Sequence, residues 1–394
     1  MIFALFGGCV IDNIGLRASF MIFSVILAIG QMIFLIASYM PGIGDHVYVL
    51  AMISQIIYGI GKKVLVICRS VAISNWFIGQ EWGLAFGICL TITNFEVLLS
   101  IFVSTLFSDP NKIKIWNIIG LCYWICAIIS SYAFTRFEKY ANELAASQFN
   151  GKQDLVERFR WSSIRKLDIR FWIISLILLC LFIPNYNFLR IFGLILDKIF
   201  DFKNENDRAL IMSINYAMPV IFSPIIGVFI DKMGHQITWL IISSILLTIS
   251  HVWFCFLPDD SHYFIILPLV VFGLSHATYF VCIWTLVPLV VTPNALGTGF
   301  GIVSAWEFFG MSISPILLAV FVENGSLEHG RIGIFSVFII FPIIGLFLSI
   351  ILYIINFLHI KKQRPAIERY NSYDERLKSY CQKVAKNDRS DSDS

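Results

Sequence analysis

Long apolar runs, separated by short polar stretches, make up most of this chain. We expect about ten of them to form membrane-spanning helices, because about 20 helical residues cross a ~30 Å hydrocarbon core. The runs are too long for barrel strands, and a helix satisfies its own backbone groups where lipid supplies no water. The expected helices cover residues 18–39, 47–74, 82–107, 114–135, 170–196, 208–230, 237–257, 263–290, 295–322 and 332–358.

One polar segment occurs twice, each time between two apolar runs. Both copies read Gly-x-x-x-Asp-x-x-Gly, and the second lies 219 residues after the first, as Asp231 lies after Asp12. A repeat at half-chain spacing is typical of transporters built from two similar halves. The motif residues are Gly8, Asp12, Gly15 and Arg17 in the first copy and Gly227, Asp231, Lys232 and Gly234 in the second.

The residue types of this motif suit a contact between helices. Gly8 and Gly227 lack side chains, so neighbouring helices can approach closely there. Asp12 and Asp231 stand at helix ends, where a carboxylate can accept hydrogen bonds from the free backbone donors of an adjacent helix N-terminus. Such a contact would exist in only one access state of a transporter and would bias the equilibrium between states. The alternative is that both turns are ordinary polar loops.

Positive charge divides the loops into two groups. Segment 136–170 holds eight Lys and Arg residues and the tail from Lys361 holds nine, whereas the loops on the other side hold six. Positive loops stay in the cytosol, so the tail, segment 136–170 and both motif turns are expected there. We expect an incomplete transmembrane half over 1–136, a cytosolic loop over 137–169, a second half over 170–360 and a cytosolic polar tail over 361–394.

Composition and missing motifs argue against several classes of function. Hydrophobic residues are 58% and charged residues 14% of the chain, against about 25% charged in soluble domains. The basic excess behind the net charge of +3 lies where membrane topology requires it, so no nucleic-acid partner is expected. The sequence has no phosphate-binding loop, zinc-protease motif or nucleophile elbow, which argues against an enzyme and against ATP-driven transport. No metal or cofactor is expected, and the nine cysteines form no C-x-x-C pair.

The two halves differ at their beginnings. The second motif follows 57 residues of its half (170–226), whereas the first motif follows seven. The repeat therefore predicts that about fifty residues, one full helix and most of a second, are missing before Met1. Met1 would then be a mispredicted start or the start of a truncated copy. A signal peptide is disfavoured, because there is no basic segment and no small-residue cleavage site.

The two motifs, the two helical halves and the basic central loop resemble the major facilitator superfamily over residues 1 to about 360. Four segments resemble one branch, the lysosomal dipeptide transporters named major facilitator superfamily domain-containing protein 1. They are Y-G-I-G…S-N-W-F-I-G-Q-E at 58–81, S-P-I-I-G-V-F-I-D-K-M-G at 223–234, I-S-H at 249–251 and L-G-T-G-F-G at 296–301.

The resemblance implies an all-α integral membrane fold of two six-helix halves, here without the first helix and most of the second. It implies alternating access, and a lysosomal or other endomembrane location rather than the plasma membrane. An accessory membrane glycoprotein is an implied candidate partner besides the lipid bilayer. In the superfamily the repeated motif is a conformational latch, and Asp12 and Asp231 match its acid. Asn13, His235 and Gln236 stand where basic residues are usual, which predicts a weaker latch.

Ionisable residues inside the apolar runs mark a candidate substrate cavity, since such residues usually face water or a partner. The resemblance makes run 47–74 the fourth of twelve helices, one of those that line the cavity. This run carries Lys62, Lys63 and Arg69, and the next carries Glu96. We hypothesise that Lys63 pairs with Glu96. Alternatively, Lys62 and Arg69 extend to the headgroups and Glu96 meets another donor.

The branch has an acid at the position of Lys63 and an arginine at that of Asn94, so a pair of Lys63 with Glu96 would have reversed polarity. In the second half, Asn187 and Arg190 follow Pro184, which suits a discontinuous helix that lines a cavity. The remaining cavity candidates are His276 and Glu307.

Two interpretations of function follow. Cations exceed acids in the candidate cavity, so a carboxylate-bearing solute fits best. A dipeptide or amino acid is the first candidate, from the resemblance, and a small organic anion is the second, from the charge. Uniport and proton symport both stay open, with Glu96, Glu307, His251 and His276 as candidate proton carriers. For the two histidines, a neutral side chain with satisfied hydrogen bonds is the favoured alternative. The alternative is a non-transporting or truncated relative that acts as a binding or scaffold protein, which the incomplete start and the altered pair favour.

Overall fold

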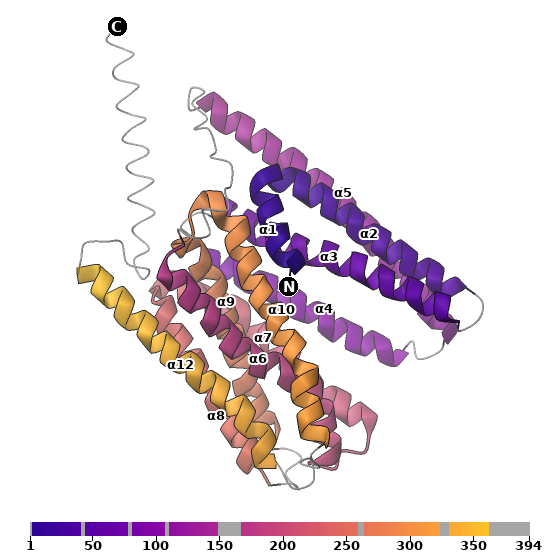
Figure 1. The fold of residues 1–394 in the computed structure, drawn as a ribbon, viewed down its shortest axis with the longest axis vertical. Helices are drawn as coiled ribbons and strands as arrows, with labels where there is room; N and C mark the ends of the chain where they lie inside the picture. Colours follow the sequence, from indigo (N-terminus) through magenta and orange to yellow (C-terminus); the bar gives the residue numbers. More distant parts are fainter. Residues whose placement is uncertain are drawn as a thin grey trace.

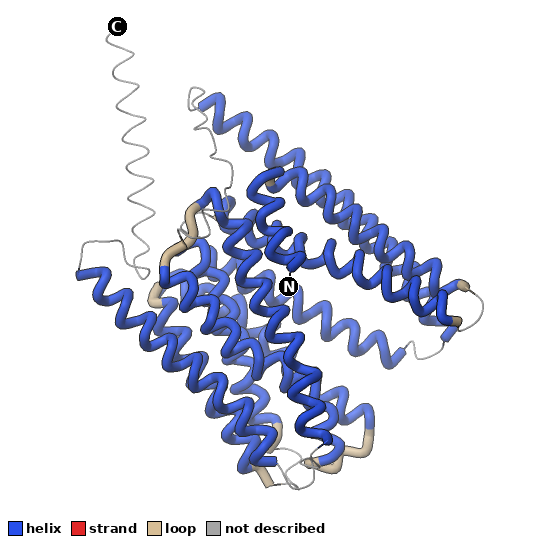
Figure 2. Tube along the Cα trace, viewed as in Figure 1, coloured by secondary structure: helices blue, strands red, loops and turns tan. Residues whose placement is uncertain are grey.

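The computed structural model describes residues 2–40, 44–77, 81–106, 110–148, 167–258, 264–323 and 331–361. These residues fold almost entirely into helices arranged as two bundles (Figures 1 and 2). We call them the first half (α1–α5) and the second half (α6–α12). Residues 149–166 of the expected central loop and 362–394 of the expected tail lie outside the described residues.

The helices follow the apolar runs closely, and nine of those in the described ranges are long and apolar enough to cross a bilayer. The ten expected helices correspond to α2–α10 and α12, which confirms an all-α membrane fold. The first half contains α1 (Ile2–Ile14), α2 (Leu16–Tyr39), α3 (Asp45–Trp76), α4 (Trp82–Leu106) and α5 (Pro110–Gln148). The second contains α6 (Ile169–Lys198), α7 (Glu205–Met233), α8 (Gln236–Phe256), α9 (Ile266–Val290), a short 3-10 turn η2 (Pro293–Ala295), α10 (Leu296–Glu323) and α12 (Arg331–Lys361).

Two helices differ from expectation. Helix α5 continues to Gln148, past the expected end at 135, because the chain has neither glycine nor proline between Gly120 and Gly151 to stop it. Helix α6 is unbroken, although Pro184 suggested a discontinuous helix. A proline removes one backbone hydrogen bond, and the close packing of α6 against α9, α10 and α12 holds the helix together.

The two halves share one helix order. Helix α1 ends at Ile14 and α7 ends at Met233, which repeats the offset of 219 residues found in the sequence. By the same offset, α2, α3, α4 and α5 correspond to α8, α9, α10 and α12. The contacts between halves are symmetric too, since α1 packs against α10 and α4 packs against α7. In the second half α6 lies beside α9, α10 and α12, and no described helix takes the matching place beside α3, α4 and α5.

The halves approach most closely at glycines near the motif turns, a region that we call the motif end. A Cβ atom on Gly8 would lie 2.2 Å from the carbonyl oxygen of Gly297, and one on Gly227 would lie 2.3 Å from that of Gly83. Helices α2, α3 and α5 of the first half diverge from the second half away from this end (Figure 1). Backbone contact at the motif end therefore depends on residues without side chains.

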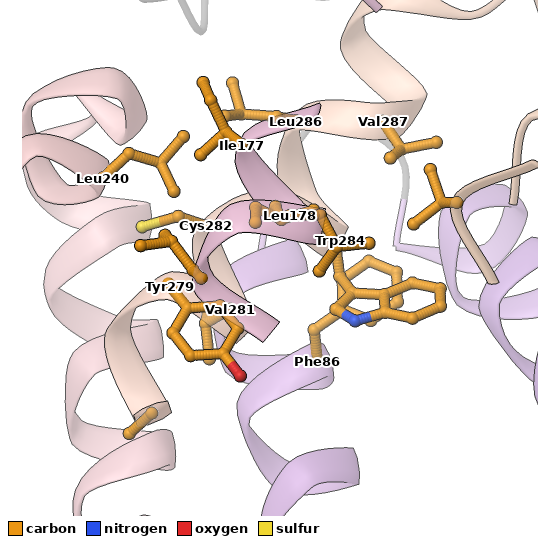
Figure 3. Close-up of a cluster of buried hydrophobic side chains, with 14 of the residues drawn as sticks. Phe86, Ile177, Leu178, Leu240, Tyr279, Val281, Cys282, Trp284, Leu286 and Val287 are labelled. Atoms are coloured by element: carbon orange, nitrogen blue, oxygen red, sulfur yellow. The ribbon is translucent and has the colours of Figure 1, made fainter. Parts of the chain in front are cut away.

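Aromatic side chains fill the interface beside these glycines. Figure 3 shows Phe86 of α4 beside the indole of Trp284 of α9, and their ring centroids lie 6.2 Å apart. Trp284 also stacks on Phe300 of α10, with centroids 5.3 Å apart. All three side chains are buried. The cluster ties α4 of the first half to two helices of the second.

We predict that Gly8→Ala lowers the stability of the protein by about 1–3 kcal/mol, because the added methyl group would overlap the Gly297 carbonyl. The matched control is Gly59→Ala, since a Cβ atom at Gly59 meets nothing within 4 Å. The midpoint of thermal unfolding in detergent would fall for the first variant and hold for the second. Equal midpoints would contradict a tight backbone contact at Gly8.

Candidate functional site

The first helix of each motif ends with the same backbone hydrogen bond. The N–H of Gly15 donates to the carbonyl of Ile11, and the N–H of Gly234 donates to that of Ile230, each at 2.9 Å. Gly15 has φ +93° and Gly234 has φ +66°, and glycine adopts such positive φ values at little cost. The glycines end α1 and α7 and place each motif aspartate one turn earlier, at the interface between the halves.

Asp12 holds the beginning of α10. Its Oδ1 accepts a hydrogen bond from the backbone N–H of Gly297 at 2.8 Å. Its Oδ2 accepts from the backbone N–H of Thr298 at 2.7 Å and from the Thr298 hydroxyl at 2.6 Å. These are donors of the first helical turn that have no partner within α10 itself.

Asp231 holds the beginning of α4 in the same way. Its Oδ1 accepts from the backbone N–H of Gly83 at 2.7 Å, and its Oδ2 accepts from that of Leu84 at 2.8 Å. Gly83 and Leu84 are the second and third residues of α4, as Gly297 and Thr298 are of α10. We call the two contacts the Asp12 latch and the Asp231 latch.

Each latch joins a negative carboxylate to the positive end of a helix dipole in the opposite half. The contact requires the halves to be together at the motif end, because the donors belong to one half and the acceptor to the other. The latches thus stabilise the arrangement in which this end is closed. The sequence predicted such a contact for Asp12 and Asp231, and the structure supplies its partners.

The basic residues of the turns, Arg17 and Lys232, are not part of the latches. The guanidinium of Arg17 lies 3.6 Å from a carboxylate oxygen of Glu138 and also donates to the Glu138 carbonyl at 3.3 Å. This contact ties α2 to α5 within the first half. Lys232 is exposed.

Lys63 pairs with Glu307 across the two halves. The Lys63 Nζ atom on α3 lies 3.9 Å from the Oε2 atom of Glu307 on α10. The hypothesis that Lys63 pairs with Glu96 therefore needs correction. Adjacent helix positions point about 100° apart, so only one of Lys62 and Lys63 can face Glu96, and the one that does is Lys62.

Lys62, Arg69 and Glu96 line a cavity of about 510 Å³ inside the first half. Lys62 and Arg69 share one face of α3, since residues seven apart lie about two helical turns apart. Trp124 and Ser131 of α5 lie on another wall. The intramembrane charges of the first half thus divide into this cavity and the Lys63–Glu307 pair.

Several buried polar atoms on α3, α6, α9 and α10 have no hydrogen-bond partner among the described residues. Three of the helices that carry them, α6, α9 and α10, pack on one another. The unpartnered atoms include both amide atoms of Asn187, the Tyr279 hydroxyl, the Trp284 indole N–H, the Ser304 hydroxyl and the Arg69 Nε atom. Buried polar groups are costly unless they are paired, so unpaired ones in a native structure call for an explanation.

The other predicted residues lie as follows. Asn94 is buried, and its amide donates to the Leu90 carbonyl of its own helix at 2.9 Å. Arg190 is exposed and lies over the Tyr186 ring, 5.0 Å from its centroid. His276 stacks on Tyr279 with ring centroids 5.5 Å apart.

His251, a candidate proton carrier, lies inside the second half instead of the interface. Its Nδ1 atom is 2.8 Å from the Leu247 carbonyl, and its ring packs among Phe188, Phe272 and Phe338. This surrounding favours a neutral, structural histidine.

The sequence did not identify the residues whose backbone N–H groups donate to Asp12 and Asp231. Their signal was present, because α4 has glycines at 83 and 87 and α10 has glycines at 297 and 301, a repeated G-x-x-x-G spacing. That spacing marks faces where helices approach closely. The donors themselves are backbone groups, which leave no mark in the sequence.

We predict that Asp12→Asn speeds alkylation of Cys9 by N-ethylmaleimide about fivefold, because an amide nitrogen would face the Thr298 donor and weaken the latch. Cys9 is 5% exposed and accepts a contact from the Thr298 hydroxyl at 3.7 Å, so it reports on the latch directly. Peptide mass spectrometry measures the rate. Asp201→Asn, a substitution of an exposed acid, is the control. An unchanged rate for Asp12→Asn would count against the latch.

Comparison with known proteins agrees with this geometry. The sequence profile described as Major Facilitator Superfamily matches residues 1–204 and 188–387. The chain is 22% identical over 371 residues to the lysosomal dipeptide transporter MFSD1 of Bos taurus, covering 90% of this chain and 75% of the relative. It is also 22% identical over 367 residues to the Homo sapiens protein of that name, with the same coverage.

Two solved structures share the fold. The human organic anion transporter MFSD10 (TETRAN) has a TM-score of 0.64 at 15% identity, covering 88% of this chain and 80% of that one. The proton:xylose symporter XylE has a TM-score of 0.67 at 14% identity, covering 94% and 86%. The protein is a multi-pass membrane transporter of a small solute and not an enzyme, and the chain belongs to the Major Facilitator Superfamily.

Proposed function

We propose that this protein moves a small carboxylate-bearing solute by alternating access, with a dipeptide or amino acid as the first candidate. The solute binds between the halves, where α3 faces α10 and where α6 and α9 bring their polar side chains. The Lys63–Glu307 pair is the observation that carries the proposal, since it sets a cation and an acid at this interface. A zwitterion needs both kinds of group.

Charge supports a solute with a carboxylate. Lys63 and Arg69 of α3 both act on the charge of Glu307, so two cations stand against one acid at this interface. A surplus of half-buried cations attracts anions and raises their local concentration. The same surplus supports a small organic anion as the second candidate.

The unpartnered polar atoms support the same location. Asn187, Tyr279 and Trp284 offer an amide, a phenol and an indole N–H at the packed helices α6 and α9. Ligand sites combine apolar walls with a few such polar groups that fix orientation. A solute that bonds to these atoms recovers the free energy lost by burying them.

The latches support alternating access. Both hold the motif end closed, while helices of the first half diverge at the other end. With the motif turns in the cytosol, as the positive loops indicate, this arrangement is closed to the cytosol. The similarity to lysosomal MFSD1 proteins supports an endomembrane location, with the opposite end facing the lumen.

We predict that proteoliposomes containing the full chain accumulate labelled dialanine or succinate, and that Lys63→Met lowers initial uptake about tenfold or more by removing the binding cation. Lys203→Met is the matched control, because the Lys203 side chain is 83% exposed in the turn after α6. No uptake of either probe by well-folded protein would favour a binding or scaffold protein instead.

We also predict that Asn187→Leu raises stability by about 1–2 kcal/mol while it lowers uptake about tenfold, since it removes two unpaired polar atoms that the solute needs. Asn117→Leu is the control. Asn117 is also buried and its amide nitrogen lacks a described partner, but it lies on α5, away from the interface. Thermal unfolding and uptake would be measured together. Unchanged uptake with Asn187→Leu would remove Asn187 from the site.

A further inference from the structure

The cavity of the first half lies where the second half has a helix. In the second half α6 packs beside α9, α10 and α12, which correspond to α3, α4 and α5. No described helix takes the matching place in the first half, and a cavity of about 510 Å³ lies there, with walls from α2, α3, α4 and α5. This volume is within the range of sites that hold small ligands.

Two cations of this cavity have no bound acid. Lys62 is exposed and Arg69 is half-buried. Within the described ranges neither forms a salt bridge, and the Arg69 Nε atom is buried without a hydrogen-bond partner. Glu96 is the one acid among the described lining residues. The cavity therefore carries an excess positive charge, at a place in the membrane where uncompensated charge is costly.

The cations lie at a depth that a lipid headgroup can reach. Helix α3 has 32 residues, or about 48 Å at 1.5 Å per residue, so it extends about 9 Å past each side of a ~30 Å hydrocarbon core. Arg69 lies seven residues before Trp76, which ends α3 at the motif end, so it stands near the edge of that core. Lys62 lies two turns deeper, and its long side chain can extend back toward the edge.

The surface of α4 beside the cavity faces lipid. This helix is apolar and long enough to cross a bilayer. Thr93 and Glu96, which line the cavity, are exposed, and the exposed side chains next to them on α4 are large and apolar, namely Ile92, Phe95, Leu99 and Phe102. A lipid can enter the cavity from this side without leaving the membrane, whereas a water-soluble anion would have to cross acyl chains.

The remaining wall suits an acyl chain. Apolar side chains from three helices line it, namely Phe20, Leu27, Leu65, Val66 and Val97. Cations and an apolar wall in one cavity match the two parts of an amphiphile. Basic pockets between transmembrane helices on the cytosolic side bind anionic headgroups in this manner.

We propose that this cavity binds one anionic phospholipid of the bilayer. Its phosphodiester lies between Lys62 and Arg69 and accepts charge-assisted hydrogen bonds from them. One acyl chain lies along Phe20, Leu27 and Leu65. The negative charge of the phosphodiester compensates the excess positive charge, and a choline headgroup would add a cation again, so the site prefers a lipid with net negative charge. This site is separate from the Lys63–Glu307 pair, and lipid binding there does not depend on the identity of the solute.

The preference for an anionic lipid is tested by thermal unfolding of the full chain in detergent with added dioleoylphosphatidylglycerol or dioleoylphosphatidylcholine. The anionic lipid should raise the unfolding midpoint about 3 °C or more above that with the zwitterionic lipid, since a ligand stabilises the form that binds it. Lys62→Gln and Arg69→Gln should each remove most of this difference. Equal midpoints for the unaltered protein in the two lipids, or an undiminished difference in both variants, overturn the proposal.

Lys63→Gln is the matched control for these two variants. Lys63 is the neighbour of Lys62 on α3, but it lies against Glu307 of α10 instead of lining the cavity. This variant should keep the difference between the two lipids. Arg69 also acts on the charge of Glu307, so the comparison uses the difference between lipids and not the midpoint itself. Loss of the difference in Lys63→Gln equal to that in Lys62→Gln would also overturn the proposal.

A variant that keeps both cations tests the place of the acyl chain. Leu65→Trp puts a larger side chain into the cavity, so protein purified from bilayers with equal parts of the two lipids should retain about tenfold less phosphatidylglycerol, measured by mass spectrometry. Ile53→Trp is the control, since Ile53 is 46% exposed on α3 and does not line the cavity. Equal retention by Leu65→Trp and Ile53→Trp overturns the place of the chain.

Two other occupants would give different results. If glycerol 3-phosphate or succinate, which have no acyl chain, shifts the midpoint as much as phosphatidylglycerol does, the cavity binds a free anion and the lipid assignment is wrong. A photoreactive benzophenone side chain at position 66 should crosslink to phospholipid in membranes, and Arg69→Gln should weaken that crosslink. A crosslink to a polypeptide instead would mean that a helix fills the cavity, as α6 does in the second half, and would overturn the proposal.

Discussion

Each half of this transporter holds the other by a carboxylate set on the first turn of a helix. The rest of the interface depends on this contact. It places the glycines of α1 and α10, and those of α4 and α7, close enough for backbone to meet backbone. It also brings Phe86 against Trp284. Lipid offers no hydrophobic force between helices, so close packing and hydrogen bonds must supply the association.

The sequence predicted the parts of this structure that depend on local composition. Apolar runs predicted the helices, and the repeated motif predicted paired turns that carry Asp12 and Asp231. It did not predict which helices supply the donors to these acids, because every helix start has free backbone donors whatever its sequence. The partner of Lys63 was predicted wrongly as Glu96, because helix rotation decides which of two adjacent lysines faces which neighbour. Ser304 was missed because hydroxyl groups are common in packed helices and their lack of partners is visible only in the structure.

The interface combines two kinds of polar chemistry. In the latches every acceptor is paired with short hydrogen bonds, and such contacts favour one arrangement of the halves. Around Asn187 and Tyr279 buried polar atoms are left unpaired, and the charge pair of Lys63 and Glu307 is loose. A binding site must keep part of its bonding capacity free for the solute, so it contributes less to stability than its burial would suggest.

The symmetry of the two latches has a consequence for how the protein tolerates change. The latches act side by side at one end, so their free energies add and their equilibrium constants multiply. If one latch is moderately weakened, the fraction of molecules closed at the motif end falls by a certain factor. A stronger second latch can offset that factor. Each copy is therefore partly redundant.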